Sequence, residues 1–340
     1  MSFLHSHSSE CLKSELDLFS LPFTQTSIES SQWIHYKPVT SLSDNSPIEF
    51  VIPGHGEKYL DLTHTMLSPI NHLLHTIFNQ IDVYFNQKLV SPPNNAYAYR
   101  AYIEALLNYS SPAKTSHLTS CLWDADTPGR MDEPVESKTA NSALVRRAHY
   151  IRERRTLDLI GHLHCDVFNQ DKFLINGVEV RLRLVRSKDS FCLMDNNGTS
   201  SKIHILDASL LVRRAKISAG LLLAHARMLS KVTAKYLLTK IEVKTFTIHS
   251  GVVAESIRLD NVILEQLPKR IIVGLFAFDL TPDLSANYAG HWNLVKHGSL
   301  RLEVRFEKAL AETVNCIIYA EFDNVIEIDS SRQVIVDFAG

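Results

Sequence analysis

The sequence has few of the residues that build disulfide scaffolds and phosphate-binding loops. Its five cysteines are odd in number and scattered, and no two of them form a CxxC pair. This usage excludes a disulfide-rich secreted scaffold and favours a reducing compartment. The twelve glycines are spread thinly over 340 residues, and the spacings GxGxxG, GxxxxGK and GxSxG do not occur. These absences exclude the common nucleotide-binding loops and the nucleophile turn of α/β-hydrolases.

Long apolar runs and an excess of one charge are also missing. The longest apolar run, around 271–278, is far shorter than the roughly 18 residues that a membrane helix needs. The first twenty residues contain no basic segment followed by an apolar core, so no secretory signal is predicted. The formal net charge of −2 provides no global attraction to nucleic acid or to an anionic membrane. We therefore expect a soluble intracellular protein, in the cytoplasm or nucleus, with no membrane partner.

Short segments rich in Val, Ile, Phe and Tyr fill most of the chain from Ile28 onward, and turn residues separate them. This pattern is typical of strands. In VEVRLRLV (178–185), apolar residues alternate with Glu179, Arg181 and Arg183. Because strand side chains alternate between two faces, the segment predicts a sheet with one buried and one solvated face. The predicted strands are 32–39, 48–52, 80–85, 172–176, 178–185, 202–212, 240–248, 299–306, 315–322 and 332–338.

Helical patterns are few, and one dipeptide predicts a hairpin. Helices are expected at 97–109, at 143–155 and in the first half of 219–237. The apolar stripe of the first helix is predicted to contain Tyr99, Tyr102, Ile103, Leu106 and Leu107. Asn176-Gly177 lies between two strand-like runs and is a strong hairpin signal. Many short strands with few helices and long loops predict an all-β protein built from a β-sandwich or jelly roll, or from two of them.

The segment GHLHCD (161–166) contains four side chains that can bind zinc. On a strand, His162 and His164 would share one face, and further ligands would have to come from elsewhere. The candidates are His64, His72 and His75. Their spacing selects none of them, and HExxH is absent. We favour the interpretation that both histidines lie on the polar face of one more strand, so no catalytic residue, metal ligand or cofactor is predicted. A metal-binding β-sandwich enzyme that uses His162 and His164 is the alternative.

A basic run at 144–155 is the main candidate for contact with nucleic acid. Its arginines are Arg146, Arg147, Arg152, Arg154 and Arg155. Such a run fits a subunit contact or a solvated loop equally well. A nucleic-acid-binding protein is therefore a second alternative, and nucleic acid is not the expected partner.

Connected blocks across nearly the whole chain resemble a group of proteins from Polinton (Maverick) elements, the virus-like self-synthesising transposons of animals. These blocks are 6–30, 70–110, 158–194, 234–248, 264–275, 276–283 and 298–329. The block 70–110 is also similar, more distantly, to the first jelly roll of large DNA virus major capsid proteins. In those proteins a strand with a short turn leads into a helix of the form YRxxIExLLNY, which stands here at 99–109.

The resemblance implies a double jelly-roll major capsid protein, which is a structural protein without an active site. Residues 1–27 would be a flexible arm, 28–195 the first jelly roll and 202–340 the second. Three copies would form a capsomer that contacts neighbouring capsomers and a minor capsid protein in a virion. Family members carry further residues after Leu67 and a long insertion after Leu275. We therefore expect both sandwiches to be shortened, with exposed sheet edges, as in a degenerate or domesticated copy.

Overall fold

The computed structural model divides the chain into two compact units. The N-terminal unit comprises Ser27–Ala234 and Ile328–Val334, and the C-terminal unit is built on Lys235–Glu327. The described residues are 27–44, 46–54, 56–67, 72–91, 95–128, 130–131, 141–151, 156–193, 202–251, 257–273, 276–281, 297–304, 306 and 308–336. The predicted arm 1–27 lies outside them except for its last residue.

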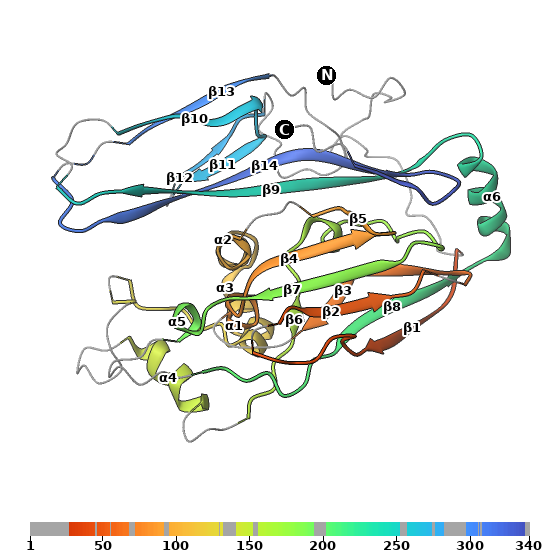
Figure 1. Ribbon diagram of the computed structural model, residues 1–340, viewed down its shortest axis with the longest axis horizontal. Coiled ribbons are helices and arrows are strands. Elements are labelled where there is room, and N and C mark those ends of the chain that lie inside the picture. The colour runs from red at the N-terminus through yellow and green to blue at the C-terminus, as the bar shows by residue number, and fades with distance from the viewer. Residues whose placement is uncertain are drawn as a thin grey trace. The chain divides into compact units, whose positions relative to one another are not determined.

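The N-terminal unit contains two four-stranded antiparallel sheets (Figure 1). One has the order β1 (Ile28–Tyr36), β8 (Leu210–Ile217), β3 (Lys58–Leu67) and β6 (Gly161–His162). The other has the order β2 (Ile48–Ile52), β7 (Val180–Arg186), β4 (Phe78–Phe85) and β5 (Lys88–Leu89). The helices are α1 (Leu73–Thr76), α2 (Tyr97–Asn108), α3 (Ser111–Lys114), α4 (Ser142–Ile151), α5 (Asp189–Cys192) and α6 (Ala219–Leu229). Among the described residues, 3-10 helices span His117–Cys121 and Asp166–Phe168.

The core of this unit follows the alternation that the sequence predicts. Val178, Val180, Leu182 and Leu184 are all 0% exposed. Full burial of such a side chain contributes roughly 1.5–3 kcal/mol, so this strand is a major source of stability. The opposite face is polar, because the register sets Arg183 of β7 opposite Glu49 of β2 and Asp82 of β4. The predicted one-sided burial of this strand is therefore confirmed.

The hairpin predicted at Asn176-Gly177 does not form. The turn itself is present, and Gly177 has a left-handed φ of 79° that favours glycine. However, β7 pairs with β2 and β4, and the preceding segment makes only an isolated bridge between Leu174 and Leu60. The prediction was wrong because a turn is a local property, whereas strand pairing depends on partners far away in sequence.

The same turn holds the C-terminal segment of the N-terminal unit. Arg332 donates from Nε to the carbonyl oxygen of Asn176 at 2.7 Å and from Nη2 to its Oδ1 at 3.0 Å. Asn86 donates from Nδ2 to the carbonyl oxygen of Arg332 at 2.8 Å, and its Oδ1 accepts the backbone N–H of Glu179. These bonds explain why Ile328–Val334 belongs to a unit that otherwise ends at Ala234.

The C-terminal unit contains a five-stranded sheet and a two-stranded ribbon. The sheet holds β9 (Ala234–Ile248), β11 (Arg270–Val273), β12 (Phe276–Asp279), β14 (Val314–Ile328) and β15 (Val334–Val336). The ribbon pairs β10 (Ile257–Gln266) with β13 (His297–Val304). Leu300 and Leu302 of β13 pack against the buried cluster around Ile271, Ile318 and Phe322. The ribbon therefore covers one face of the sheet and closes a small sandwich.

An exposed sheet edge lies at the point where the resemblance implied missing residues. β11 and β12 pair in an antiparallel register with Val273 opposite Phe276. β12 is the edge strand, and its Phe276 and Phe278 are 71% and 49% exposed. A helix long and apolar enough to span a membrane is absent from the described residues.

Two further expectations differ from the structure. The segment 210–217 was assigned to the second jelly roll, but as β8 it pairs with β1 and β3 in the N-terminal unit. The extent of α2 agrees with the prediction, but its buried face does not. Leu106 and Leu107 are each 46% exposed, and Arg100 and Glu104 are buried instead. The apolar stripe predicted for this helix is therefore wrong, for reasons that become clear at the candidate site.

Candidate functional site

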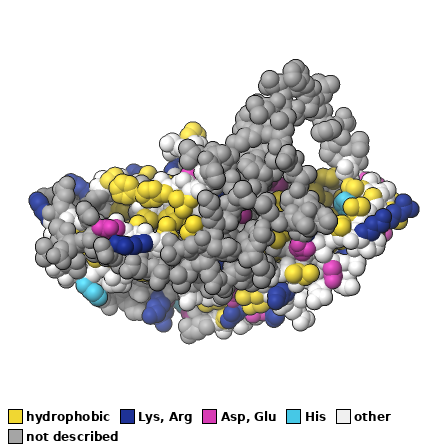
Figure 2. Space-filling model, turned by 90° about the horizontal axis from the view of Figure 1, so that it is seen from above, with side chains coloured by type: hydrophobic (Ala, Val, Ile, Leu, Met, Phe, Trp, Pro, Cys, Tyr) yellow, Lys and Arg dark blue, Asp and Glu magenta, His cyan; other side chains and the backbone are white. Residues whose placement is uncertain are grey.

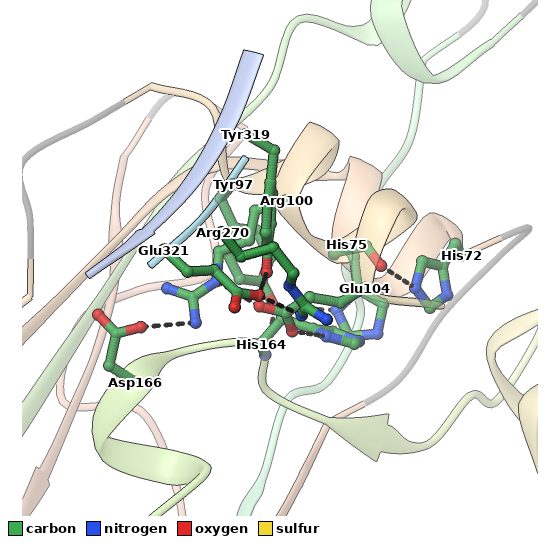
Figure 3. A network of polar contacts seen from close by, with 11 residues as sticks. His72, His75, Tyr97, Arg100, Glu104, His164, Asp166, Arg270, Tyr319 and Glu321 are labelled. Atoms are coloured by element: carbon green, nitrogen blue, oxygen red, sulfur yellow. Dashed lines mark hydrogen bonds and ion pairs between the residues drawn. The ribbon is translucent and has the colours of Figure 1, made fainter. Parts of the chain in front are cut away.

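A cluster of buried polar side chains joins α1, α2 and the segment after β6 in the N-terminal unit (Figure 3). Its members are His72, His75, Tyr97, Arg100, Glu104, His164 and Asp166, and none is more than 7% exposed. So many ionisable groups in a protein interior are costly to desolvate unless they satisfy one another. The geometry of the cluster therefore needs an explanation.

The polar face of α2 builds the centre of the cluster. Tyr97, Arg100 and Glu104 follow one another at spacings of three and four residues, which places them on one side of the helix. Ala101 and Ala105 are 0% exposed beside them, and such small side chains leave room for a close neighbour. α1 occupies this room, because His72 at its N-terminal end contacts the carbonyl oxygen of Ala101 through Nε2 at 2.9 Å.

Arg100 and two carboxylates form the charged part of the cluster. Arg100 Nε donates to Glu104 Oε1 at 2.8 Å, and its Nη2 lies 2.7 Å from Asp166 Oδ1. His164 Nδ1 lies 2.6 Å from Glu104 Oε2. Burial alone would raise the pKa of Glu104, but attraction to Arg100 and the bond with His164 outweigh it and hold the pKa at about 2. Glu104 is therefore ionised at neutral pH.

Three imidazole rings meet beside these charges. The ring centroid of His75 lies 4.4 Å from that of His72 and 4.6 Å from that of His164. One nitrogen from each of the three rings lies within 4.8 Å of the other two. Burial lowers the pKa of His72 to about 3, and burial also lowers the pKa of His75 far below its usual value. Both rings are thus neutral at pH 7, which is the form that binds metals.

One nitrogen of each ring has a hydrogen-bond partner among the described residues. His72 uses Nε2 for Ala101, His75 uses Nδ1 for the hydroxyl of Tyr97 at 2.8 Å, and His164 uses Nδ1 for Glu104. Among the described residues, the buried Nδ1 of His72 has no hydrogen-bond partner. The three histidines could hold a metal ion.

The sequence-based interpretation of GHLHCD needs correction. Only Gly161 and His162 belong to a strand, and Leu163, His164, Cys165 and Asp166 are all buried. The two histidines therefore do not share the polar face of a strand. His164 lies among buried rings with His72 and His75, whereas His162 is half-buried on β6 and outside the trio. The side chain of His64 lies outside the described part of the chain.

Cys165 does not extend the cluster as a reactive thiol. Burial raises its pKa to about 12, with a smaller opposing effect of Arg100. A thiol in this state is a poor nucleophile at neutral pH. The spacing of Arg100 and Glu104 in the predicted helix is a sequence signal for a polar helix face, but only the fold shows that this face is buried.

The described part of the basic run is already paired with acidic groups. Arg146 donates to both carboxylate oxygens of Asp124, at 2.6 and 2.8 Å. Arg147 donates to Asp126 Oδ1 at 2.7 Å and to the carbonyl oxygen of Asp124. Arg152, Arg154 and Arg155 lie outside the described residues. Figure 2 shows one face of the molecule, on which the described side chains carry charges of both signs.

Comparisons with known proteins add the following findings. No protein-family model matches the chain. The uncharacterized protein F54H12.2 of Caenorhabditis elegans is 23% identical over 289 residues, and this chain spans 65% of its length. VP54 of the virus PBCV-1, fitted into a reconstruction of the virophage Sputnik, matches 95% of this chain at 9% identity with a TM-score of 0.54. A cryo-EM structure of Sputnik itself matches the whole chain at 12% identity with a TM-score of 0.51.

The chain has a double jelly-roll fold. The match to VP54 also covers 100% of that chain, so it extends over both of its halves. At identities this low the likeness concerns the fold, and the all-β double jelly roll predicted from the sequence is confirmed at this level.

Proposed function

We propose that this double jelly-roll protein is a structural capsid-type subunit, derived from a Polinton or Maverick element, that self-associates into trimeric capsomers. The observation that carries the proposal is the match of its fold, over 95% of the chain, to the PBCV-1 protein VP54. The blocks that resemble the Polinton group support the origin. The role is structural rather than enzymatic, and its expected partners are further copies of the chain and a minor capsid protein.

Assembly of this kind depends on burying apolar surface between copies. α6 offers such surface, because none of its side chains is buried in the N-terminal unit. Leu223 and Met228 on this helix are 54% and 56% exposed. A helix with this composition is unusual on the surface of a monomer. We assign it to contact with a neighbouring copy.

The solution mass of the purified chain tests this proposal. Light scattering on a sizing column should give one species at three times the chain mass of 38.4 kDa. A Leu223→Glu variant should shift this species towards the monomer, because it would place a charge in the buried contact. Lys202→Glu changes an exposed residue outside α6 and should leave the mass unchanged. A monomer at every concentration for the unaltered protein would contradict trimer formation.

A nucleic-acid-binding function is less well supported. Such a function requires arginines whose charge is available to phosphates. Arg146 and Arg147 are instead bound to Asp124 and Asp126.

A further inference from the structure

We propose that His72, His75 and His164 form a zinc-binding site in the N-terminal unit of the double jelly roll. The proposal is independent of capsid assembly, because it rests on side chains within one unit of one chain. Zinc is the ion of choice for neutral imidazole ligands, and its filled d shell tolerates the geometry that a protein imposes.

The distances between the rings fit a site that closes slightly around the ion. In a tetrahedral site with Zn–N bonds of about 2.0–2.1 Å, the ligand nitrogens lie roughly 3.3 Å from one another. The three nitrogens here are within 4.8 Å of one another. The nitrogens must therefore approach one another by up to about 1.5 Å when the ion binds.

The groups behind the rings are those that a metal site requires. A ligating histidine usually donates its second ring nitrogen to a carboxylate, carbonyl or hydroxyl group, which fixes the ring and its tautomer. Here these partners are Glu104 for His164, the carbonyl oxygen of Ala101 for His72, and the Tyr97 hydroxyl for His75. Each ring thus has one nitrogen in contact with a group that can fix its orientation.

The unpartnered nitrogen of His72 is an independent sign of a ligand. His72 is 0% exposed, and its Nδ1 has no hydrogen-bond partner among the described residues. A buried acceptor without a partner destabilises a protein, and native interiors contain few of them. A bound cation would satisfy this nitrogen, whereas simple packing of the three rings leaves it unsatisfied.

The surrounding charge favours a cation. The nearby ionised groups are Arg100, Glu104 and Asp166, which carry one positive and two negative charges and therefore sum to −1. No fourth His, Cys, Asp or Glu of the described residues completes the group. A pocket lined in part by Tyr97, Arg100, His164 and Asp166 adjoins it. We therefore assign the fourth position to a solvent oxygen.

Metal analysis of the full, tag-free chain tests the proposal. The unaltered protein should bind about one Zn²⁺ per chain, and Co²⁺ added to the metal-free protein should give the visible absorption of a tetrahedral site. His164→Asn and His75→Asn should each abolish both signals. The side-chain amide of asparagine takes the place of Nδ1 of a histidine ring. It can therefore keep the contact with Glu104 at position 164 and the contact with Tyr97 at position 75, but it removes the second ring nitrogen.

Two controls separate this site from other histidines. His162→Ala removes a histidine of the same segment that lies outside the trio, and it should leave the stoichiometry unchanged. A double His5→Ala and His7→Ala variant removes the other histidine-rich stretch of the sequence and should also have no effect. Metal binding that survives His164→Asn, or that disappears in either control, would overturn the proposal.

A measurement on the unaltered protein covers the case in which the variants do not fold. X-ray absorption of the zinc-loaded chain should show about four nitrogen or oxygen ligands in the first shell, together with the outer-shell scattering of three imidazole rings. A folded chain, verified by circular dichroism, that neither retains Zn²⁺ nor gives the Co²⁺ absorption would refute the site directly.

Discussion

Replacing Glu104 by glutamine should destabilise the N-terminal unit by about 3 kcal/mol, because it removes a charge from the centre of a buried network. Glu104 contacts Arg100 at 2.8 Å and His164 at 2.6 Å, and its side chain is only 4% exposed. Removing one partner of a buried ion pair costs roughly 3–5 kcal/mol. Asp166 still compensates Arg100 at 2.7 Å, so we expect the lower end of this range.

A matched change at the surface provides the control. Glu49 contacts Arg181 at 3.0 Å, and the two side chains are 19% and 47% exposed, compared with 4% for Glu104. Exposed pairs contribute roughly 0–1 kcal/mol, so Glu49→Gln should have a small effect. Both changes replace a carboxylate by an amide of the same shape, and they differ mainly in burial.

Urea unfolding followed by the fluorescence of Trp123 measures the difference. Trp123 is 5% exposed, and its ring lies 5.2 Å from that of His72. Replacing Trp33 and Trp292 by phenylalanine isolates this signal, which matters because a chain with two compact units need not unfold in one step. EDTA keeps metal binding out of the comparison. Equal losses for Glu104→Gln and Glu49→Gln would refute the reasoning that burial makes the loss of one charged partner costly.

Two further predictions concern close packing and thiol chemistry. A Cβ at Gly54 would lie 2.1 Å from the backbone carbon of Val178, so Gly54→Ala should lower the free energy of unfolding by roughly 1–3 kcal/mol or more in the same assay. A Cβ at Gly220 in α6 would meet no atom within 4 Å, so Gly220→Ala should be neutral or slightly stabilising. Burial raises the pKa of Cys121 to about 11, so iodoacetamide at pH 8 should label it slowly in the native chain and rapidly in urea, as mass spectrometry would show. Because the unfolded thiol ionises near pH 8.5 while the folded thiol keeps its proton, this group should also lower stability as pH rises above about 8.5; fast native labelling would contradict both expectations.

Local periodicity predicted the strands well where one face is buried. The alternation in 178–185 can be read from eight consecutive residues, and the structure buries Val178, Val180, Leu182 and Leu184 completely. The limits of β2 were predicted correctly as 48–52, for the same reason. The pairing of these strands could not be predicted, because the register between β2 and β7 joins residues more than a hundred positions apart.

α2 shows why a correct helix can have a wrongly predicted face. Its leucines suggested an apolar stripe, and nothing in the local pattern marked Arg100 and Glu104 as buried. These two side chains enter the interior only because Asp166 and His164, about sixty residues away, neutralise and bind them. The histidine site was beyond prediction for the same reason: His72 and His75 were candidates, but only the fold brings His164 to them.

The buried network and the histidine trio make a connected prediction about stability. Buried ion pairs contribute little net stability by themselves, since desolvation offsets their attraction. Without metal, α1 and α2 should therefore have low local stability. Zinc should stabilise them, because it binds preferentially to the folded state. The C-terminal unit has a separate apolar core around Ile271, Ile318 and Phe322, so zinc should not change its stability. Hydrogen exchange with and without zinc should thus slow the amides of 97–108 and leave those of 314–322 unchanged; equal slowing in both segments would indicate that the ion acts elsewhere.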